Sequence, residues 1–376
     1  MKNLLIKSLI ATLFLTLFFA GCSQKESKLE MLPNISKAKV KRIEFKDIKG
    51  FYEDDLSLAF EVFKKDCKRA KRYNLFEDIC LKAENFSNPS QFFTENFTAY
   101  ELHNDDGTNE GLITGYYEPL LFGSRTKNEE YKYPIYKTPK DMYVIDLSAA
   151  YPELDKYRLR GKVVNGKILA YDERAELNKR DDLEAICYVN DEIDLFFLQI
   201  QGSGKVQLDT GEFINVGYSN QNGHKYFAIG RALLKEGVLE KTGASLQGIK
   251  RYLKENPSKI ESILNKNKSY IFFTERKQSA TGALGTPLVA HRNLAVDRKY
   301  IPLGMPVFIN TKNSVSQEKI DTLMVAADVG GAIKGQIRAD FYFGNGDNAE
   351  LWAGGMKEKG KLTILVPNEK IETTKK

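Results

Sequence analysis

Apolar residues along the chain change their spacing several times. At residues 53–83 and 223–255 they recur every three or four positions with charged residues between them, which is typical of amphipathic helices. From Gly111, and again from Tyr270, the pattern changes to short β-rich runs separated by glycine, proline, asparagine and aspartate. The runs include residues 112–118, 131–136, 162–170, 195–201, 206–216, 271–273, 305–310, 322–327, 337–343 and 361–366. Many short strands with such turns predict a mainly β fold of barrels or sandwiches rather than a doubly wound parallel sheet.

The N-terminus has the pattern of an export signal. Two lysines precede an apolar stretch, residues 9–20, that is too short for a comfortable transmembrane span of about 20 residues. Cys22 resembles the lipidated cysteine of the bacterial lipoprotein box, although Phe19 stands where that box usually has leucine. The resemblance implies that residues 1–21 are a lipoprotein signal peptide, that Cys22 carries the lipid, and that Ser23 directs sorting to the outer membrane. A plain secretory signal with an unrelated cysteine is the alternative.

The rest of the chain has the composition of a folded protein. Its 376 residues favour two domains, and 42% hydrophobic with 28% charged residues excludes a disordered chain. The polar stretch at residues 22–39 is typical of a tether between a membrane and a domain. The formal net charge of +6 is a mild excess, which argues against nucleic acid as a partner and suits an anionic polymer or surface.

Several chemistries lack the residues that they need. The three histidines have no zinc-ligand spacing, and no phosphate loop, dinucleotide fingerprint or serine-hydrolase motif is present. The sequence therefore calls for no metal and no cofactor. Cys67 and Cys80 could close a short disulfide loop in an exported protein, which would leave Cys187 over. The sequence leaves that bridge open and does not favour a catalytic cysteine.

Two aspartates enclose a glycine-rich turn near the C-terminus. Asp328 precedes the glycines, and Asp340 lies beside three consecutive aromatic residues in a run typical of a strand. Burial beside aromatic rings would hold the Asp340 carboxyl protonated near neutral pH. The alternatives are that Asp328 only bonds the backbone of the turn, and that Asp340 pairs with Arg338 on the same strand face. A third aspartate, Asp297, lies upstream of both.

Glycine-punctuated segments also carry the groups that polysaccharide clefts use. Aromatic faces suit sugar rings, while amide and carboxylate groups suit hydroxyls. Such groups are found at Tyr116, Tyr117, Glu118, Gln199, Gln201 and Tyr218. The alternative interpretation is that these are ordinary strand residues.

Taken in order along residues 110–367, these motifs resemble one family, the membrane-bound lytic murein transglycosylases of the A type. Asp297, Asp328 and Asp340 match the three aspartates for which the family's C-terminal module is named. The other matching motifs are Thr114-Gly115-Tyr116-Tyr117-Glu118-Pro119, Tyr133-Pro134-Ile135-Tyr136, Leu198-Gln199-Ile200-Gln201-Gly202-Ser203-Gly204 and Asn222-Gly223-His224.

The resemblance implies a two-domain β fold. A double-psi β-barrel would be assembled from residues 40–120 and 275–368, the second segment being the three-aspartate module. A smaller β-barrel, residues 121–274, would be inserted between them. The substrate groove would lie between the two domains.

The resemblance also implies the reaction. The family cleaves the β-1,4 bond from N-acetylmuramic acid to N-acetylglucosamine in peptidoglycan and leaves a 1,6-anhydromuramic acid end. Asp340 would act as the single acid and base, Asp328 would orient substrate or modulate the pKa of Asp340, and Asp297 would support them. The predicted glycan contacts are Tyr117, Gln199, Gln201 and Gly202.

Two other functions remain open from the residues alone. One is a hydrolase in which Asp328 is the second carboxylate and water attacks. The other is a non-catalytic peptidoglycan-binding lipoprotein. The expected location of the protein is the periplasmic face of the outer membrane, where a lipid anchors it, with glycan strands and other cell-wall enzymes as partners.

Overall fold

The structure is a computed structural model, and it describes residues 29–32, 35–70, 76–154, 156–240, 245–278 and 280–373. Its larger β structure is a nine-stranded sheet with the order β1-β2-β3-β18-β15-β16-β14-β17-β4. Six of these strands close into a barrel, because β18 pairs with β4 as well as with β15. The strands are β1 (Glu30–Leu32), β2 (Ser36–Ile43), β3 (Phe97–His103), β4 (Gly111–Glu118), β14 (Asn293–Val296), β15 (Pro306–Asn313), β16 (Glu318–Asp328), β17 (Arg338–Asn345) and β18 (Lys357–Pro367).

Helices cover one side of this barrel. α2 (Leu56–Ala70) packs on β16, and α3 (Glu77–Glu84) and α4 (Pro89–Asn96) pack on α2. Cys67 of α2 and Cys80 of α3 form the disulfide that the sequence left open, with Cα atoms 5.6 Å apart. The buried rings between these helices and β3 are Phe60, Phe63, Phe92, Phe93 and Phe97. The remaining elements of this part are η1 (Phe45–Asp47), α10 (Asp347–Gly355) and α11 (Asn368–Thr373).

A second sheet follows β4 along the chain, and all its strands lie between β4 and β14 in sequence. Its order is β13-β12-β11-β5-β10-β6, and its two edges meet at a single bridge between Lys137 and Phe273. Cys187, which forms no disulfide among the described residues, is buried in its core, and burial raises the pKa of its thiol to about 12. The strands are β5 (Leu120–Ser124), β6 (Tyr133–Tyr136), β10 (Ala185–Val189), β11 (Ser203–Leu208), β12 (Phe213–Gln221) and β13 (Ile271–Arg276).

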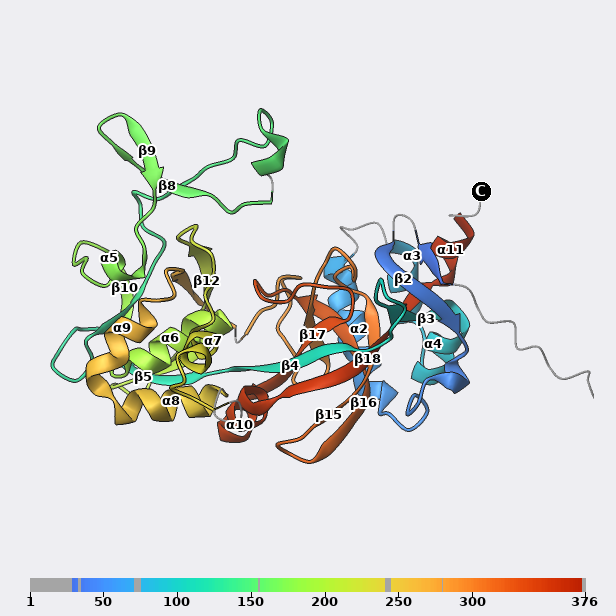
Figure 1. The fold of residues 1–376 in the computed structure, drawn as a ribbon. Helices are drawn as coiled ribbons and strands as arrows, with labels where there is room; N and C mark the ends of the chain where they lie inside the picture. The colour runs from blue at the N-terminus through green and yellow to red at the C-terminus, as the bar shows by residue number, and fades with distance from the viewer. Residues whose placement is uncertain are drawn as a thin grey trace, which may run out of the picture.

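The two sheets lie side by side, and the chain passes from β4 of the first directly into β5 of the second (Figure 1). The nine-stranded sheet with its helices is called the first body, and the six-stranded sheet with its helices the second body. A three-stranded sheet projects from the second body as an arm (Figure 1). The arm contains β7 (Tyr143–Val144), η3 (Pro152–Leu154), β8 (Arg160–Val164) and β9 (Lys167–Ala170). The helices of the second body are α5 (Arg174–Leu177), α6 (Glu192–Gln201), α7 (Ile229–Lys235), α8 (Leu246–Glu255), η5 (Pro257–Lys259) and α9 (Ile260–Leu264).

Two sequence predictions are wrong. The apolar run 195–201 is not a strand but most of α6, because Asp191 caps the N–H groups of Ile193 and Asp194 and Gly202, with φ +81°, ends the helix. A helix buried on most sides is apolar throughout, so its sequence resembles a buried strand.

The tether predicted at residues 22–39 is also too long. β1 and the start of β2 fall within it, because Ser36, Ala38 and Val40 alternate buried with exposed or partly exposed lysines along β2. This alternation buries one face of the strand and makes it part of the sheet.

The mainly β fold and the helical regions near the N-terminus and at 223–255 are confirmed. The double-psi connection and the domain limits at 40, 120, 275 and 368 stay predictions. The signal peptide and Cys22 lie outside the described residues. Within the part of the chain that is described, no helix is long and apolar enough to cross a membrane.

Candidate active site

Three neighbouring strands place two carboxylates in one row across the first barrel. Ala295 of β14 lies opposite Asp328 of β16 on one side and opposite Asp340 of β17 on the other. Paired residues on neighbouring strands point to the same face of a sheet, so only the methyl group of Ala295 stands between the two aspartates. Two strand spacings separate their Cα atoms by roughly 10 Å.

Asp340 is the more lightly bonded of the two carboxylates. The hydroxyl of Thr114, its neighbour on β4, donates to Asp340 Oδ1 at 2.5 Å. Arg338 Nη2 in turn donates to the same hydroxyl at 2.9 Å, so the guanidinium reaches Asp340 through Thr114. Burial raises the pKa of Asp340, while the Thr114 hydrogen bond and the Arg338 charge oppose that rise. The carboxyl is therefore held in a desolvated position with one hydrogen-bond donor, and its pKa lies above the ordinary value.

Asp328 is held by backbone groups. Its Oδ1 accepts the N–H of Ala283 and that of Val329, both at 2.9 Å. It thus bonds the backbone of the turn, at Val329 rather than at the glycines. Burial raises the pKa of Asp328 to about 6, and the negative charge of Asp340 adds to that rise. A second group able to hold a proton near neutral pH therefore lies in the same row.

Aromatic rings form the next row of the same face. Tyr116 on β4 and Tyr342 on β17 are paired, and their ring centroids lie 5.0 Å apart. They pack with Ala295 and with Ile333 of the turn in one buried cluster. These rings exclude water from one side of the carboxylates, which is the physical cause of the raised pKa values.

Asp297 supports the turn between β16 and β17. Its Oδ2 accepts the N–H of Gly335 at 3.0 Å and its Oδ1 accepts the N–H of Lys299 at 3.2 Å. Gly335 has φ +127°, a conformation that L side chains rarely adopt. Asp297 thus fixes the turn that carries Ile333 onto the aromatic rings, while it stands outside the row of Asp328 and Asp340.

The predicted glycan contacts gather where β4 meets α6. Tyr117 N–H donates to Gln201 Oε1 at 3.3 Å, and Gly202 ends that helix. Tyr117 follows Tyr116, so its side chain points to the opposite face of β4, where it is only 2% exposed. Gln199 is also buried, whereas Gln201 and Gly202 are partly exposed.

Two site residues were missed by the sequence analysis as parts of the site. In the sequence Thr114 stands out only as part of a motif, and Tyr342 only as part of an aromatic run. Arg338, Asp340 and Tyr342 recur at every second position, which signals one strand face. The partner residue Thr114 had no such signal, because the pairing of β4 with β17 joins segments far apart in sequence.

Comparisons with known proteins identify the family. Residues 112–274 match the family model described as the MltA specific insert domain, and residues 292–366 match the 3D domain. A crystal structure of MltA from Neisseria gonorrhoeae superposes with a TM-score of 0.79 at 30% identity, covering 91% of this chain and 95% of that one. The chain belongs to the membrane-bound lytic murein transglycosylase A family.

Other similar proteins carry the same family name. A membrane-bound lytic murein transglycosylase from Agrobacterium tumefaciens has a TM-score of 0.80 at 28% identity, covering 89% of this chain and 99% of that one. The Escherichia coli K12 membrane-bound lytic murein transglycosylase A is 29% identical over 78% of this chain and 75% of its own length. The Buchnera aphidicola homolog is 33% identical over 67% of this chain, and the match spans 65% of the homolog.

One structural relative was solved with a sugar. Escherichia coli MltA with bound chitohexaose has a TM-score of 0.68, covers 92% of this chain and 99% of its own, and at 22% identity shows a shared fold. The family and the enzyme class predicted from the sequence, a peptidoglycan lytic transglycosylase, are confirmed.

Proposed function

We propose that this transglycosylase cleaves the β-1,4 bond between N-acetylmuramic acid and N-acetylglucosamine without water, using Asp340 as the single acid and base. The observation that carries the proposal is the contrast between the two carboxylates of the row. Asp340 has one side-chain donor, Thr114, whereas Asp328 is held by two backbone N–H groups. Asp340 is thus freer to exchange a proton with substrate.

The proton balance needs only one carboxyl group. Protonated Asp340 donates to the bridging oxygen as the bond from that oxygen to C1 of N-acetylmuramic acid breaks. The 6-hydroxyl of the same sugar attacks C1, a C1–O6 bond forms, and the hydroxyl proton passes to the Asp340 carboxylate. Because the nucleophile already belongs to the substrate, its attack is effectively intramolecular. The enzyme returns to its starting state.

Asp328 and Asp297 have supporting roles in this scheme. Asp328 places a second carboxyl group beside Asp340. Because the two carboxylates interact, the charge of Asp328 modulates the pKa of Asp340. Asp297 holds the turn. We further propose that Gln201 and Gly202 contact the glycan strand, whereas the buried Tyr117 shapes the wall behind them, as does Gln199.

Digestion of purified sacculi tests the proposal. We expect wild type to release muropeptides with anhydro ends, each one water lighter than the reducing form. Asp340→Asn should reduce release by roughly a hundredfold or more, because general acid–base catalysis contributes about that much. Asp209→Asn, in an exposed turn of the second body, is the matched control and should keep full activity. Reducing ends in the wild-type products would favour the hydrolase with Asp328 as second carboxylate, and equal release by Asp340→Asn would reject the assignment of Asp340.

We also propose attachment to the outer membrane through a lipid on Cys22. The support is the export signal followed by a cysteine in the lipoprotein-box position. Incorporation of labelled palmitate into the wild type, and its loss in Cys22→Ala, would test this. Labelling of Cys22→Ala to the wild-type level would contradict it.

A further inference from the structure

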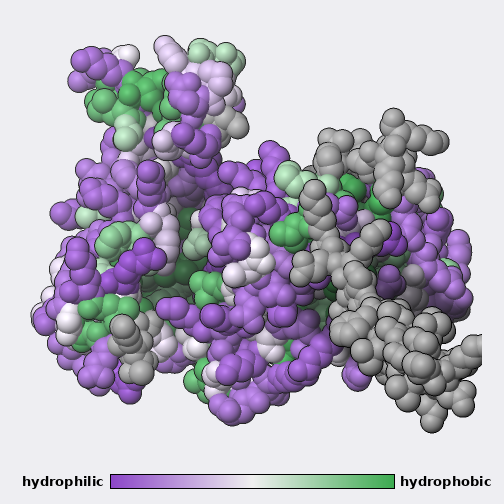
Figure 2. Space-filling model, turned by 45° about the vertical axis from the view of Figure 1, so that its right-hand side comes forward, coloured by the Kyte–Doolittle hydropathy of each residue, from purple (hydrophilic) through white to green (hydrophobic). Residues whose placement is uncertain are grey.

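The arm, residues 143–170, exposes apolar side chains that no other described part of the chain covers. Among the described residues, none of the arm's side chains belongs to the buried clusters of the two bodies. All eight residues from Val163 to Ala170 are exposed, with Val163 at 57% and Ile168 at 62%. Figure 2 shows an apolar patch at the end of the arm among hydrophilic neighbours.

The tip of the arm carries exposed aliphatic side chains on both of its faces, and one of these faces also carries Lys162 and Lys167. β8 and β9 form a hairpin whose turn is Asn165-Gly166, both with positive φ. Val163 pairs with Ile168, so these two lie on one face, while Val164 and Leu169 lie on the other. A protein partner that packs on one face of this hairpin would leave the other face in water. A hydrocarbon medium would cover both.

The hairpin itself carries only basic charges, of which Lys162 is paired with Asp172 at the base while Lys167 is exposed beside the turn; the acidic residues Asp146 and Glu153 lie in the other part of the arm. Residues 160–170 contain Arg160, Lys162 and Lys167 and no acidic residue. Exposed tyrosines surround the same arm, and Lys156 lies 5.3 Å from the ring of Tyr157. Aliphatic side chains flanked by basic residues and tyrosines are typical of segments that enter the interface of an anionic bilayer. The exposed tyrosines are Tyr143, Tyr151 and Tyr157.

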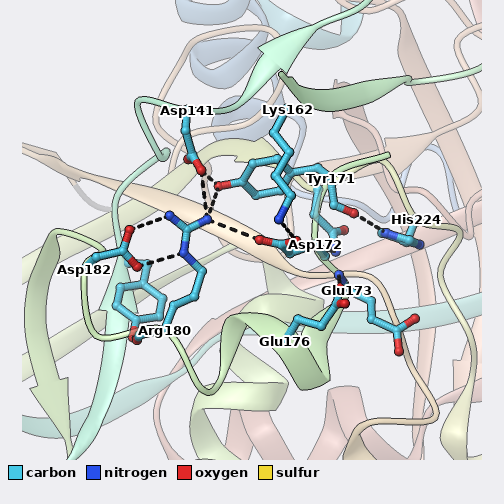
Figure 3. A network of polar contacts seen from close by, with 11 residues as sticks. Asp141, Lys162, Tyr171, Asp172, Glu173, Glu176, Arg180, Asp182 and His224 are labelled. Atoms are coloured by element: carbon cyan, nitrogen blue, oxygen red, sulfur yellow. Dashed lines mark hydrogen bonds and ion pairs between the residues drawn. The ribbon is translucent and has the colours of Figure 1, made fainter. Parts of the chain in front are cut away.

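The base of the arm is fixed to the second body by a polar network (Figure 3). Arg180 donates to Asp141, just before the arm, at 2.9 Å and to Asp172, just after it, at 3.2 Å. Tyr171 donates to Asp141 at 2.6 Å, and Lys162 of β8 pairs with Asp172. One guanidinium thus clamps both ends of the arm, which holds its tip away from the rest of the protein.

We propose that the β8–β9 hairpin docks into an anionic lipid surface as a second membrane contact, independent of the N-terminal lipid. Val163, Val164, Ile168 and Leu169 would enter the interface from both faces of the hairpin, while Lys167 would contact lipid phosphates. The proposal does not depend on the catalytic assignment of Asp340.

Vesicle sedimentation tests the proposal with a chain of residues 23–376, which carries every described element and no Cys22. Wild type should bind vesicles of phosphatidylglycerol and phosphatidylethanolamine, and bind phosphatidylcholine vesicles more weakly. Val163→Ser with Ile168→Ser should weaken binding about tenfold or more, and Lys167→Gln should weaken binding to the anionic vesicles alone. The matched control is Phe122→Ser with Phe213→Ser, an exposed apolar pair on the second body, which should bind as wild type does.

The outcomes separate the possible occupants. Selective loss in the hairpin variant, with muropeptide release from sacculi unchanged, supports lipid docking. Equal binding by wild type and hairpin variant, or no binding by wild type, overturns the proposal. A wild-type dimer in sedimentation-velocity runs that Val163→Ser with Ile168→Ser dissociates would assign the tip to a second copy of the chain, which also overturns it.

Discussion

One hydroxyl group links the proposed acid to a cation. The Thr114 hydroxyl accepts a hydrogen bond from Arg338 through its oxygen and donates its own hydrogen to Asp340, so it links a cation to the carboxyl without direct contact. This arrangement stabilises the Asp340 carboxylate that forms after proton donation, while burial stabilises the protonated form that starts the reaction. The balance of the two sets the pKa of Asp340.

Replacing Thr114 by valine should shift that balance. The variant keeps the shape but removes the hydrogen bond that lowers the pKa of Asp340, so that pKa should rise further. A hydrogen bond to a charged group contributes about 1.5–3 kcal/mol, and one pKa unit is about 1.4 kcal/mol. We therefore expect the alkaline limb of kcat/KM to move up by roughly one pH unit. Thr114→Ser should restore the wild-type profile, and an unshifted profile for Thr114→Val would argue against the link.

Asp328 should make stability depend on pH. Its folded pKa, about 6, lies above its ordinary value of 3.8, so the folded state binds more protons between those values. The contribution of Asp328 to the free energy of unfolding is therefore fully present below about pH 4 and is lost as the pH rises towards 6. The asparagine of Asp328→Asn does not titrate. The free energy of unfolding of this variant minus that of wild type should therefore increase from pH 4 to pH 6, by at most about 3 kcal/mol. Denaturant unfolding of both proteins at pH 4, 5, 6 and 7 measures this, and a constant difference would contradict it.

At the scale of elements, the turn between β16 and β17 connects the two aspartates. Asp297 accepts an N–H of this turn at Gly335, and Ile333 of the turn packs on Tyr116 and Tyr342. The turn therefore closes the aromatic side of the row. Its geometry depends on one glycine with positive φ and on one carboxylate that lies beyond the end of β14.

Asp297→Ala should loosen the turn and leave the pKa values of the row unchanged. Two backbone N–H groups, of exposed Lys299 and half-buried Gly335, lose their acceptor, and a hydrogen bond of this kind contributes about 0.5–1.5 kcal/mol to stability. We expect a lower melting temperature and a kcat/KM that is lower by about tenfold. The acid and alkaline limbs of the kcat/KM profile should stay at the same pH values as in wild type. Asp297→Asn, which keeps an acceptor oxygen, should recover most of the activity. A displaced alkaline limb in Asp297→Ala would instead give Asp297 a direct part in proton transfer.

Single elements were predictable where the local pattern decides them. Alternation around Asp340 placed it inside a strand, and β17 confirms this, because the side-chain period of a strand is local. α6 was mistaken because a buried helix is apolar on most faces. The row itself was not predictable: Ala295 meets Asp328 through a parallel pairing and Asp340 through an antiparallel one, and both registers depend on closure of the whole barrel.

At the scale of the whole molecule, one lysine joins the two bodies. Lys250 of α8 lies 2.8 Å from Asp194 of α6 and 2.6 Å from Glu350 of α10, which packs on the first barrel. The side chain of Tyr117 is close enough for the Glu350 charge to add to the rise that burial causes in its pKa. As one of 56 basic residues, Lys250 had no sequence signal that set it apart.

Lys250→Met tests whether this junction sets the position of the proposed glycan contacts, Gln201 and Gly202, relative to Asp340. Without the cation, Asp194 and Glu350 are two neighbouring negative charges, so α6, with Gln201 at its end, should move away from α10. If about 1 kcal/mol of glycan binding is lost, KM for sacculus digestion should rise about fivefold, while the pH limbs that Asp340 sets should stay. Lys250→Arg keeps the charge and should lie near wild type. Lys254→Met, a more exposed lysine of the same helix, is the matched control, and an equal rise in KM for both methionine variants would show that the junction does not position the glycan.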